Sequence, residues 1–263
     1  DGVNDVLALK DADCGVAMAS GADAACQVAQ LVLLDSDFAA MPKVVAEGRR
    51  VINNIQRAAS LFLVKNIFSL FLSIISLFTV MPYPLEPIHL SVISAMTIGV
   101  PSFILTFEPR YDRVKGRFLP EVLRRAFPGG LTNVFVVLLC QLFMVVFALP
   151  QDEVSTICAA ILSFVGLLVL YQICKPFNWF RKLLWWAMAA GIVLCFTLLG
   201  DILDLRTWTD EVRLVMFTLL VMTPTVFLAI QRIFDWCEQT RLRFAAWCRG
   251  VWAKRPFRKK EKA

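Results

Sequence analysis

Histidine is nearly absent from this sequence, and its cysteines are scattered. His89 is the only histidine, so a metal site built from several histidines of this chain is excluded. No CxxC pair and no Cys/His cluster occurs among the cysteines, which are Cys14, Cys26, Cys140, Cys158, Cys174, Cys195, Cys237 and Cys248. Several lie in apolar runs, where a small thiol is an ordinary packing residue. We therefore predict reduced, structural cysteines without a disulfide framework.

Acidic residues are missing from the long apolar runs. Hydrophobic residues make up 58% of the chain, above the roughly 45–50% of soluble domains. Six runs have the length of about 18–22 residues that a bilayer requires, and we place spans at 61–80, 88–107, 131–149, 154–173, 183–200 and 212–233. A buried core helix could explain one such run but not six in succession. The sequence predicts an α-helical membrane protein with six transmembrane helices.

Lysine and arginine are placed asymmetrically between these spans. The loops after the second and fourth spans hold nine basic residues, namely Arg110, Arg113, Lys115, Arg117, Arg124, Arg125, Lys175, Arg181 and Lys182. The segments 81–87 and 150–153 hold none, and 201–211 holds only Arg206. Basic loops stay on the cytoplasmic side. We predict a multi-pass protein with both chain ends in the cytoplasm.

The region before the first span has a different pattern. Short helices are expected at 6–12 and 22–29 and short strands at 14–18 and 31–34, which is typical of the edge of a parallel α/β sheet. Helical periodicity then runs over 42–80, about 58 Å at about 1.5 Å per residue, whereas a bilayer core is about 30 Å thick. We therefore divide the chain into a soluble α/β part at 1–41, a stalk helix at 42–60, a membrane domain at 61–233 and a tail at 234–263.

The tail is basic and contains tryptophans. From 231 to the end it has ten Lys/Arg against three acidic residues, interleaved with Trp236, Trp247 and Trp252. Nucleic acid is one partner for such a segment. A tail tethered at a bilayer more simply lies on anionic lipid, so we predict a basic amphipathic tail on membrane lipid and no nucleic-acid partner.

The sharpest local motif is Asp1-Gly2-Val3-Asn4-Asp5. Two carboxylates and an amide around a glycine suit a hard cation such as Mg²⁺ and the phosphate that it carries. The same residues also describe an ordinary turn. Because the chain opens inside this motif, we expect it to be part of a longer protein.

The surroundings of the motif are more specific. The run DGVNDVLALKDADCGVAMASGADAA, followed by QLVLLDSDFAAMPKVVAEGRRVINNIQRAASLFLVKN, resembles the end of the phosphorylation domain and the fifth-helix stalk of P-type cation-transporting ATPases. The run SAMTIGVPSFILTFEP is most like the bacterial group called cation-transporting ATPase E, which is associated with calcium. The resemblance covers the spans up to about residue 233.

This resemblance implies a set of roles. Residues 1–41 would be the C-terminal edge of a Rossmann-like, HAD-type α/β phosphorylation domain in a pump of the bacterial plasma membrane that uses ATP and Mg²⁺. Asp1 would be the Mg²⁺ ligand, Asn4 and Asp5 would help hold the phosphoryl group and the loop, and Lys10 would support them. The simpler alternative for Lys10 is a solvated helix residue.

Several segments of the family are not in this sequence. It has no DKTGT segment with the phosphorylated aspartate and no TGE segment. It also has no nucleotide-binding domain and no fourth membrane helix. We expect missing N-terminal actuator, nucleotide-binding and phosphorylation segments to act with this chain, which alone cannot hydrolyse ATP.

Polar residues inside the predicted spans mark a cation pathway, because intramembrane polar groups are costly. We predict Asn66, Ser69, Ser94 and Thr97 as ligands of the transported cation. The resemblance supports Asn66, whereas Ser69 and Ile98 stand where calcium pumps of the family carry a glutamate and an aspartate. The alternative for the hydroxyls is helix packing with hydrogen bonds to their own helix.

The charge of this pathway is unusual for calcium. Ca²⁺ takes six to eight oxygens, carboxylates among them, but no predicted span contains Asp or Glu. Lys65 adds a positive charge that either reaches out to the membrane surface or serves as a built-in counter-ion. We predict the C-terminal part of an ATP-driven pump that moves calcium or another metal cation through an aspartyl-phosphate intermediate. The rival is a non-enzymatic channel or scaffold subunit; a soluble phosphatase of the same superfamily is excluded by the six spans.

Overall fold

A computed structural model describes residues 1–79, 83–114, 116–147, 150–198, 200 and 210–253. The chain forms two compact units. One comprises Asp1–Asn53 with Pro109–Lys115, and the other comprises Asn54–Glu108 with the chain from Gly116 onward. The predicted position of Arg206 and the end of the predicted tail, 254–263, lie outside the described residues.

The first unit contains two parallel strands and short helices. Its elements are the 3-10 turn η1 (Val3–Asp5), α1 (Val6–Asp11), β1 (Val16–Met18), α2 (Asp23–Val28), β2 (Leu31–Leu33) and the turn η2 (Phe38–Ala40). Val16 pairs with Leu31 and Met18 with Leu33, and Ala17 and Ala25 are fully buried between strand and helix. The predicted alternation and parallel pairing are confirmed. Two strands are not a complete Rossmann-like domain, so the HAD-type assignment stays a prediction.

A single long helix follows, as the periodicity predicts. Helix α3 (Met41–Phe78) has 38 residues and ends two residues before the predicted end. Before this helix, Asp37 Oδ1 accepts from the Ala39 nitrogen at 2.8 Å and caps the turn η2. In the first unit, the Asn53 side chain donates to the carbonyls of Arg110 and Asp112, which ties the segment 109–115 to this helix.

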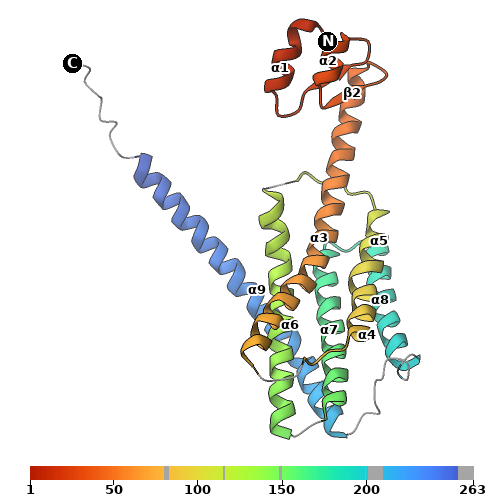
Figure 1. The fold of residues 1–263 in the computed structure, drawn as a ribbon, viewed down its shortest axis with the longest axis vertical. Coiled ribbons are helices and arrows are strands. Elements are labelled where there is room, and N and C mark those ends of the chain that lie inside the picture. The colour runs from red at the N-terminus through yellow and green to blue at the C-terminus, as the bar shows by residue number, and fades with distance from the viewer. Residues whose placement is uncertain (80–82, 115, 148–149, 199, 201–209, 254–263) are drawn as a thin grey trace, which may run out of the picture. The chain divides into compact units, whose positions relative to one another are not determined.

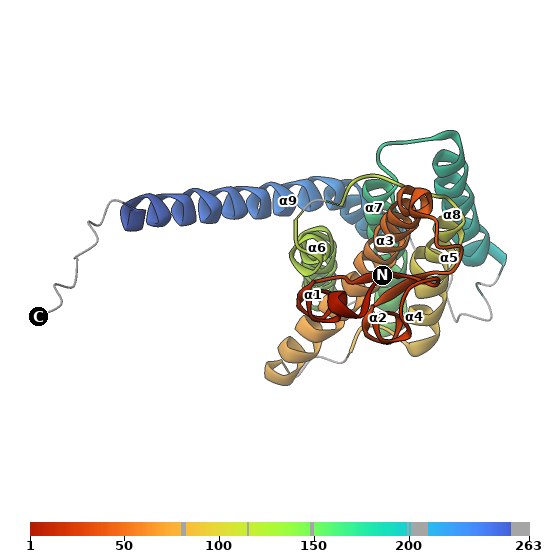
Figure 2. The same ribbon diagram turned by 90° about the horizontal axis from the view of Figure 1, so that it is seen from above.

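The second unit is a helical bundle with α7 (Gln151–Ile173) at its centre (Figures 1 and 2). The other helices are α4 (Pro87–Ser94), the π-helical turn η3 (Ala95–Gly99), α5 (Val100–Thr106), α6 (Phe118–Phe147), α8 (Trp179–Leu198) and α9 (Asp210–Ala253). Helix α7 packs against α4, η3, α6, α8 and α9. Its Val154, Ile157, Ile161 and Val165 are fully buried. Apolar side chains all around one helix fit a central position.

Six stretches of the described residues are long and apolar enough to cross a membrane, and they coincide with the six predicted spans. Two of them extend well beyond the predicted bounds. Helix α6 begins at Phe118 and continues through Pro128-Gly129-Gly130, where we expected a break. Helix α9 continues from Asp210 through Pro224 to Ala253, across the predicted end of the membrane domain at 233. The side chains of Trp247, Cys248 and Trp252 lie outside the described part of α9.

Packing explains why α6 continues through its glycine pair. An added Cβ on Gly129 would lie 2.5 Å from Val169 Cγ2, and one on Gly130 would lie 2.5 Å from Ile67 Cγ2. The glycines therefore allow α3 and α7 to approach α6 closely, as small residues do between membrane helices. Proline removes one backbone hydrogen bond, and such a loss is tolerated in membrane helices.

Candidate phosphorylation turn and cation pocket

The opening motif forms a compact turn held by its own carboxylate. Asp5 Oδ2 accepts from the Gly2 nitrogen at 2.9 Å. The Asp5 nitrogen donates in turn to the Gly2 carbonyl at 3.1 Å. Asp5 thus shapes the turn, while the Asp1 carboxylate stays exposed.

The turn lies beside the loop that follows strand β1. The Ala22 nitrogen donates to the Asp1 carbonyl at 2.7 Å, and a Cβ on Gly21 would lie only 2.8 Å from that oxygen. The Ser20 nitrogen donates to Ser36 Oγ at 2.9 Å, which joins the loops after β1 and β2. The carboxyl ends of parallel strands are where α/β sheets bind their ligands. The motif therefore lies at the edge where such a sheet binds ligands.

The turn fits Mg²⁺ only as a site with few protein ligands. Among the described residues, no group of three or more His, Cys, Asp or Glu is placed to hold a metal. Mg²⁺, however, is commonly held by one or two carboxylates and completes its octahedron with phosphate and water oxygens. The exposed carboxylate of Asp1, with side-chain exposure of 81%, meets that requirement.

Asn4 and Lys10 are less closely tied to the turn. Both are exposed, Asn4 in η1 and Lys10 near the end of α1. In the described part of the chain, Lys10 forms no ion pair with Asp1 or Asp5, although it is five residues from the latter. The supporting role of Lys10 stays a prediction.

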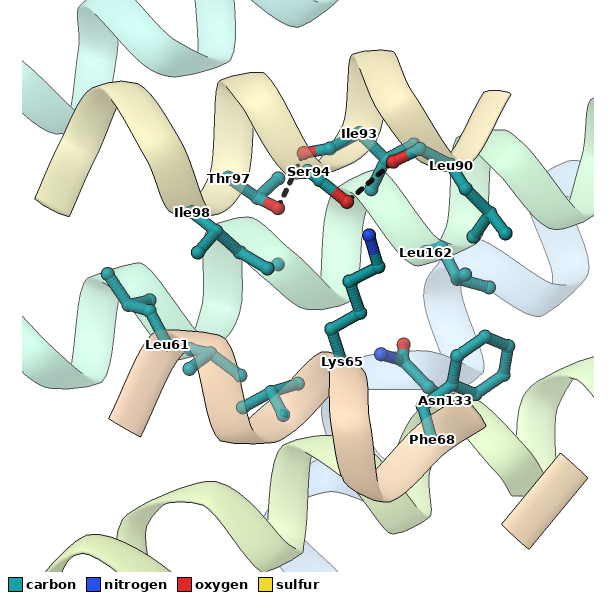
Figure 3. Close-up of a pocket in the computed structure, with 13 residues that line it drawn as sticks. Leu61, Lys65, Phe68, Leu90, Ile93, Ser94, Thr97, Ile98, Asn133 and Leu162 are labelled. Carbon is teal, nitrogen blue, oxygen red and sulfur yellow. Dashed lines mark hydrogen bonds between the residues drawn. The ribbon is translucent and has the colours of Figure 1, made fainter. Parts of the chain in front are cut away.

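The bundle contains a small cavity of about 40 Å³ between α3, α4, η3, α6 and α7. That volume holds about three water molecules, since one water needs about 10–15 Å³ measured this way. Four of the lining residues are polar: Lys65, Ser94, Thr97 and Asn133. The other walls are aliphatic or aromatic, with Phe68 and Leu162 among them. Figure 3 shows the Lys65 side chain extending from α3 across this pocket toward Ser94 of α4.

The hydroxyl groups in the pocket donate to their own helix. Ser94 Oγ donates to the Leu90 carbonyl at 2.5 Å, and Thr97 Oγ1 donates to the Ile93 carbonyl at 2.7 Å (Figure 3). Their protons are therefore used, but each oxygen keeps lone pairs that a cation can share. Thr97 belongs to η3, and single π-helical turns are frequent at functional sites.

The structure does not bring all the predicted pathway residues together. Lys65, Ser94 and Thr97 line the pocket, although Lys65 is itself exposed. Asn66 and Ser69 are exposed on α3 and do not line it. Their role as cation ligands stays a prediction that requires another segment to cover that face of α3. Asn133 was missed, since the motifs that carried the resemblance lie on other segments. The available signal was its amide in a predicted span.

One carboxylate lies at the end of the bundle, but its charge is already balanced. Glu108, just beyond α5, contacts Arg181 at 2.7 Å and Arg57 at 3.4 Å. Their side chains are 12%, 9% and 3% exposed, respectively, and Arg181 also donates to the Pro176 carbonyl at 2.6 Å. A carboxylate held by two guanidinium groups is a structural pair rather than a cation ligand. Glu108 therefore does not supply the acidic group that the spans lack.

The chain is similar in sequence to several curated cation-transporting ATPases. No family model matches the chain. A probable cation-transporting ATPase, exp7, of Streptococcus pneumoniae is 35% identical over 242 residues, which is 88% of this chain and 31% of that protein. The calcium-transporting ATPase CtpE of Mycolicibacterium smegmatis is 41% identical over 75% of this chain and 27% of its own length. The P-type sodium-transporting ATPase4 of Plasmodium falciparum is 31% identical over 68% of this chain and 14% of its length.

These likenesses define the class of the protein. The chain belongs to the P-type cation-transporting ATPases, which confirms the resemblance in its sequence. The transporting relatives and the six span-length helices together identify a multi-pass membrane protein. The chain spans less than a third of the length of the curated relatives named above.

Proposed function

We propose that this chain is part of an ATP-driven pump that translocates a metal cation through an aspartyl-phosphate intermediate. The observation that carries this proposal is a combination in one chain: an exposed carboxylate turn beside parallel strands, and a pocket with polar side chains inside a bundle. One uninterrupted helix, α3, contains residues of both units. It is the element through which a change at the turn would reach the pocket.

The residues of the turn have separate roles in this proposal. Asp5 fixes the backbone through the Gly2 nitrogen, which leaves the Asp1 carboxylate free to hold Mg²⁺. Asn4 would offer its side-chain amide to the phosphoryl group. When bound, Mg²⁺ supplies positive charge that neutralises the phosphoryl oxygens. The phosphorylated aspartate and the ATP site belong to segments outside this sequence.

The transported cation meets neutral oxygens and one ammonium in the bundle. Calcium is the cation named for some relatives and sodium for another. Because no predicted span carries a carboxylate, we propose that fewer divalent ions bind than in a two-site calcium pump. Lys65 is exposed, but it also lines the pocket and extends toward Ser94 in Figure 3, and on this ground we propose the counter-ion role.

We further propose a place in the plasma membrane with both chain ends in the cytoplasm. The basic residues between the spans support this orientation. The exposed residues Arg241 and Arg243 of α9 support contact of the tail with anionic lipid. A channel or scaffold subunit would share these helices, but the family membership does not favour it.

The test is phosphoenzyme formation by the complete reading frame that contains this chain. Asp1→Asn should abolish Mg²⁺-dependent labelling by radioactive ATP, because the variant loses the carboxylate that holds Mg²⁺. Asp11→Asn, another exposed acidic residue of the same unit, is the matched control and should label normally. Normal phosphoenzyme levels in membranes with Asp1→Asn would refute the assignment.

A further inference from the structure

Asn133 presents a buried acceptor without a donor. Its residue is 6% exposed, and its Oδ1 is buried and has no hydrogen-bond partner in the described structure. Buried side-chain oxygens are nearly always paired, so such an exception calls for an explanation. A missing ligand is one explanation, since Asn133 lines the pocket that also contains Lys65, Ser94 and Thr97.

Two buried hydroxyl groups near Asn133 donate within their own helices. Thr132, the residue before Asn133, donates to the Pro128 carbonyl at 2.7 Å. Ser163 of α7 donates to the Ala159 carbonyl at 2.8 Å. Both are buried and bonded within their own helix. Ser102 Oγ and Gln172 Oε1 are also buried without a partner, but neither lines the pocket, so Asn133 is distinguished by its place beside Lys65, Ser94 and Thr97.

The chemistry of the pocket indicates what is missing. Asn133 Oδ1 on α6, Ser94 Oγ on α4 and Thr97 Oγ1 on η3 are three neutral oxygens around one space (Figure 3). Carbonyl and hydroxyl oxygens are ligands of hard cations. No lining residue is acidic, so the pocket offers no negative charge to balance that of the ion.

The Lys65 ammonium limits the charge of the occupant. Coulomb repulsion by one ammonium is twice as strong for a divalent ion as for a monovalent ion at the same distance. An ammonium also has three N–H donors and can itself bind to the three oxygens. A metal cation and the Lys65 ammonium therefore compete for the same ligands.

We propose that Asn133 is a ligand of a site for one monovalent metal cation, formed together with Ser94 and Thr97. The Lys65 ammonium competes with the cation for these oxygen ligands. The proposal rests on the proposed function, because it takes the pocket to be part of a cation pathway. It adds a third helix, α6, to a pathway that the sequence placed on the first two spans. It also names a class of cation, for which Na⁺ and K⁺ are the probes.

The experiment compares three variants of the complete reading frame, purified in detergent and in proteoliposomes. Asn133→Leu keeps the size of the side chain but removes the oxygen, and Asn133→Asp adds a carboxylate. Thr132→Val is the matched control, since Thr132 is adjacent, fully buried and outside the pocket lining. Thermal unfolding with increasing Na⁺ or K⁺ measures binding, and ATP hydrolysis with the same cations measures function.

We expect Asn133→Leu to raise the half-saturating concentration of Na⁺ or K⁺ about tenfold or more in both assays, as the loss of one bond to a charged group predicts. Thr132→Val should change it less than about twofold. Asn133→Asp should pair with Lys65 and shift the preference toward Ca²⁺ over Na⁺ or K⁺. Unfolding in cation-free buffer should be no easier for Asn133→Leu than for Thr132→Val, because leucine leaves no unpaired oxygen.

The outcomes of this experiment distinguish a failure of this proposal from a failure of the proposed function. If the wild type responds to cations but Asn133→Leu responds equally, or Thr132→Val fails equally, Asn133 is not a ligand and the proposal is overturned. If Asn133→Leu does not fold, an unchanged cation preference in Asn133→Asp overturns it. If the wild type neither binds cations nor shows cation-dependent ATP hydrolysis, the pump assignment itself fails and the site with it.

Discussion

Gly166 allows α7 to approach the π-helical turn η3, and an alanine there tests how the bundle shapes the pocket. An added Cβ would lie 2.5 Å from Thr97 Cγ2 and 2.7 Å from Thr97 Cβ. Rotation of the threonine can move Cγ2, but Cβ is fixed to the backbone. Gly166→Ala therefore forces η3 and α7 apart by roughly 0.7 Å to reach an ordinary 3.4 Å contact.

Two opposing contributions determine how Gly166→Ala changes the free energy of unfolding. Overpacking of this kind costs about 1–3 kcal/mol, whereas replacing glycine by alanine inside a helix gains about 1 kcal/mol. We expect a net loss of roughly 0–2 kcal/mol in the free energy of unfolding. Because Thr97 lines the pocket, we also expect weaker stimulation of ATP hydrolysis by the transported cation.

Gly191→Ala in α8 is the matched control. Its new Cβ would meet only Met96 Sδ, at 3.4 Å, and a methionine side chain can yield. This variant should be neutral or slightly stabilised and should keep its cation dependence. Both variants are measured by thermal unfolding in detergent and by ATP hydrolysis. Equal stability and equal cation dependence of Gly166→Ala and Gly191→Ala would refute the packing argument.

Three further predictions address topology, the pathway and the buried ion cluster. Single cysteines on a cysteine-free background, labelled from outside intact cells, should react at 150–153 but not at 110–127, 174–182 or 234–263; labelling of the tail would overturn the six-span topology. Asn66→Ala should weaken cation-stimulated ATP hydrolysis more than Ser73→Ala, and a neutral residue at Lys65 should change ion stoichiometry or selectivity. Unchanged cation dependence in both would place the pathway elsewhere. Glu108→Gln removes the carboxylate between buried guanidinium groups and should lower the free energy of unfolding by about 3–5 kcal/mol. The control Glu121→Gln, on a more exposed helix surface, should lower it by about 1 kcal/mol or less. Equal losses in thermal unfolding would contradict the burial argument.

The elements that the sequence predicted well are those in which local pattern and packing agree. The alternation at 1–35 indicated short helices and strands, and β1 and β2 pair in parallel as expected. The six apolar runs likewise coincide with helices of span length. In these segments every residue type favours the structure that the surroundings also require.

The continuation of α6 through Pro128 could not be predicted in the same way. Proline and two glycines end a helix by local rules, but Gly129 and Gly130 meet Val169 and Ile67 on other helices. Such contacts join residues that are far apart in the sequence. Tertiary packing therefore outweighed local propensity.

For the candidate sites, too, the sequence predicted some features, whereas others depend on tertiary packing. Their polarity within a predicted span singled out Asn66 and Ser69, but it did not reveal that the pocket is lined by Lys65 and by neither of these two residues. The amide of Asn133 in a predicted span was visible in the sequence, but the burial of its oxygen without a partner depends on how α6 packs against other helices.

ATP-driven ion uptake tests the central claim most directly. Inside-out membrane vesicles that contain the complete protein are supplied with ATP and, in separate assays, with Ca²⁺, Mn²⁺, Mg²⁺, Na⁺ or K⁺. We predict that at least one cation accumulates against its gradient in the wild type and that Asp1→Asn abolishes this uptake without loss of the protein from the membrane. Cation flux that is independent of ATP and unaffected by Asp1→Asn would contradict the pump assignment and indicate a channel.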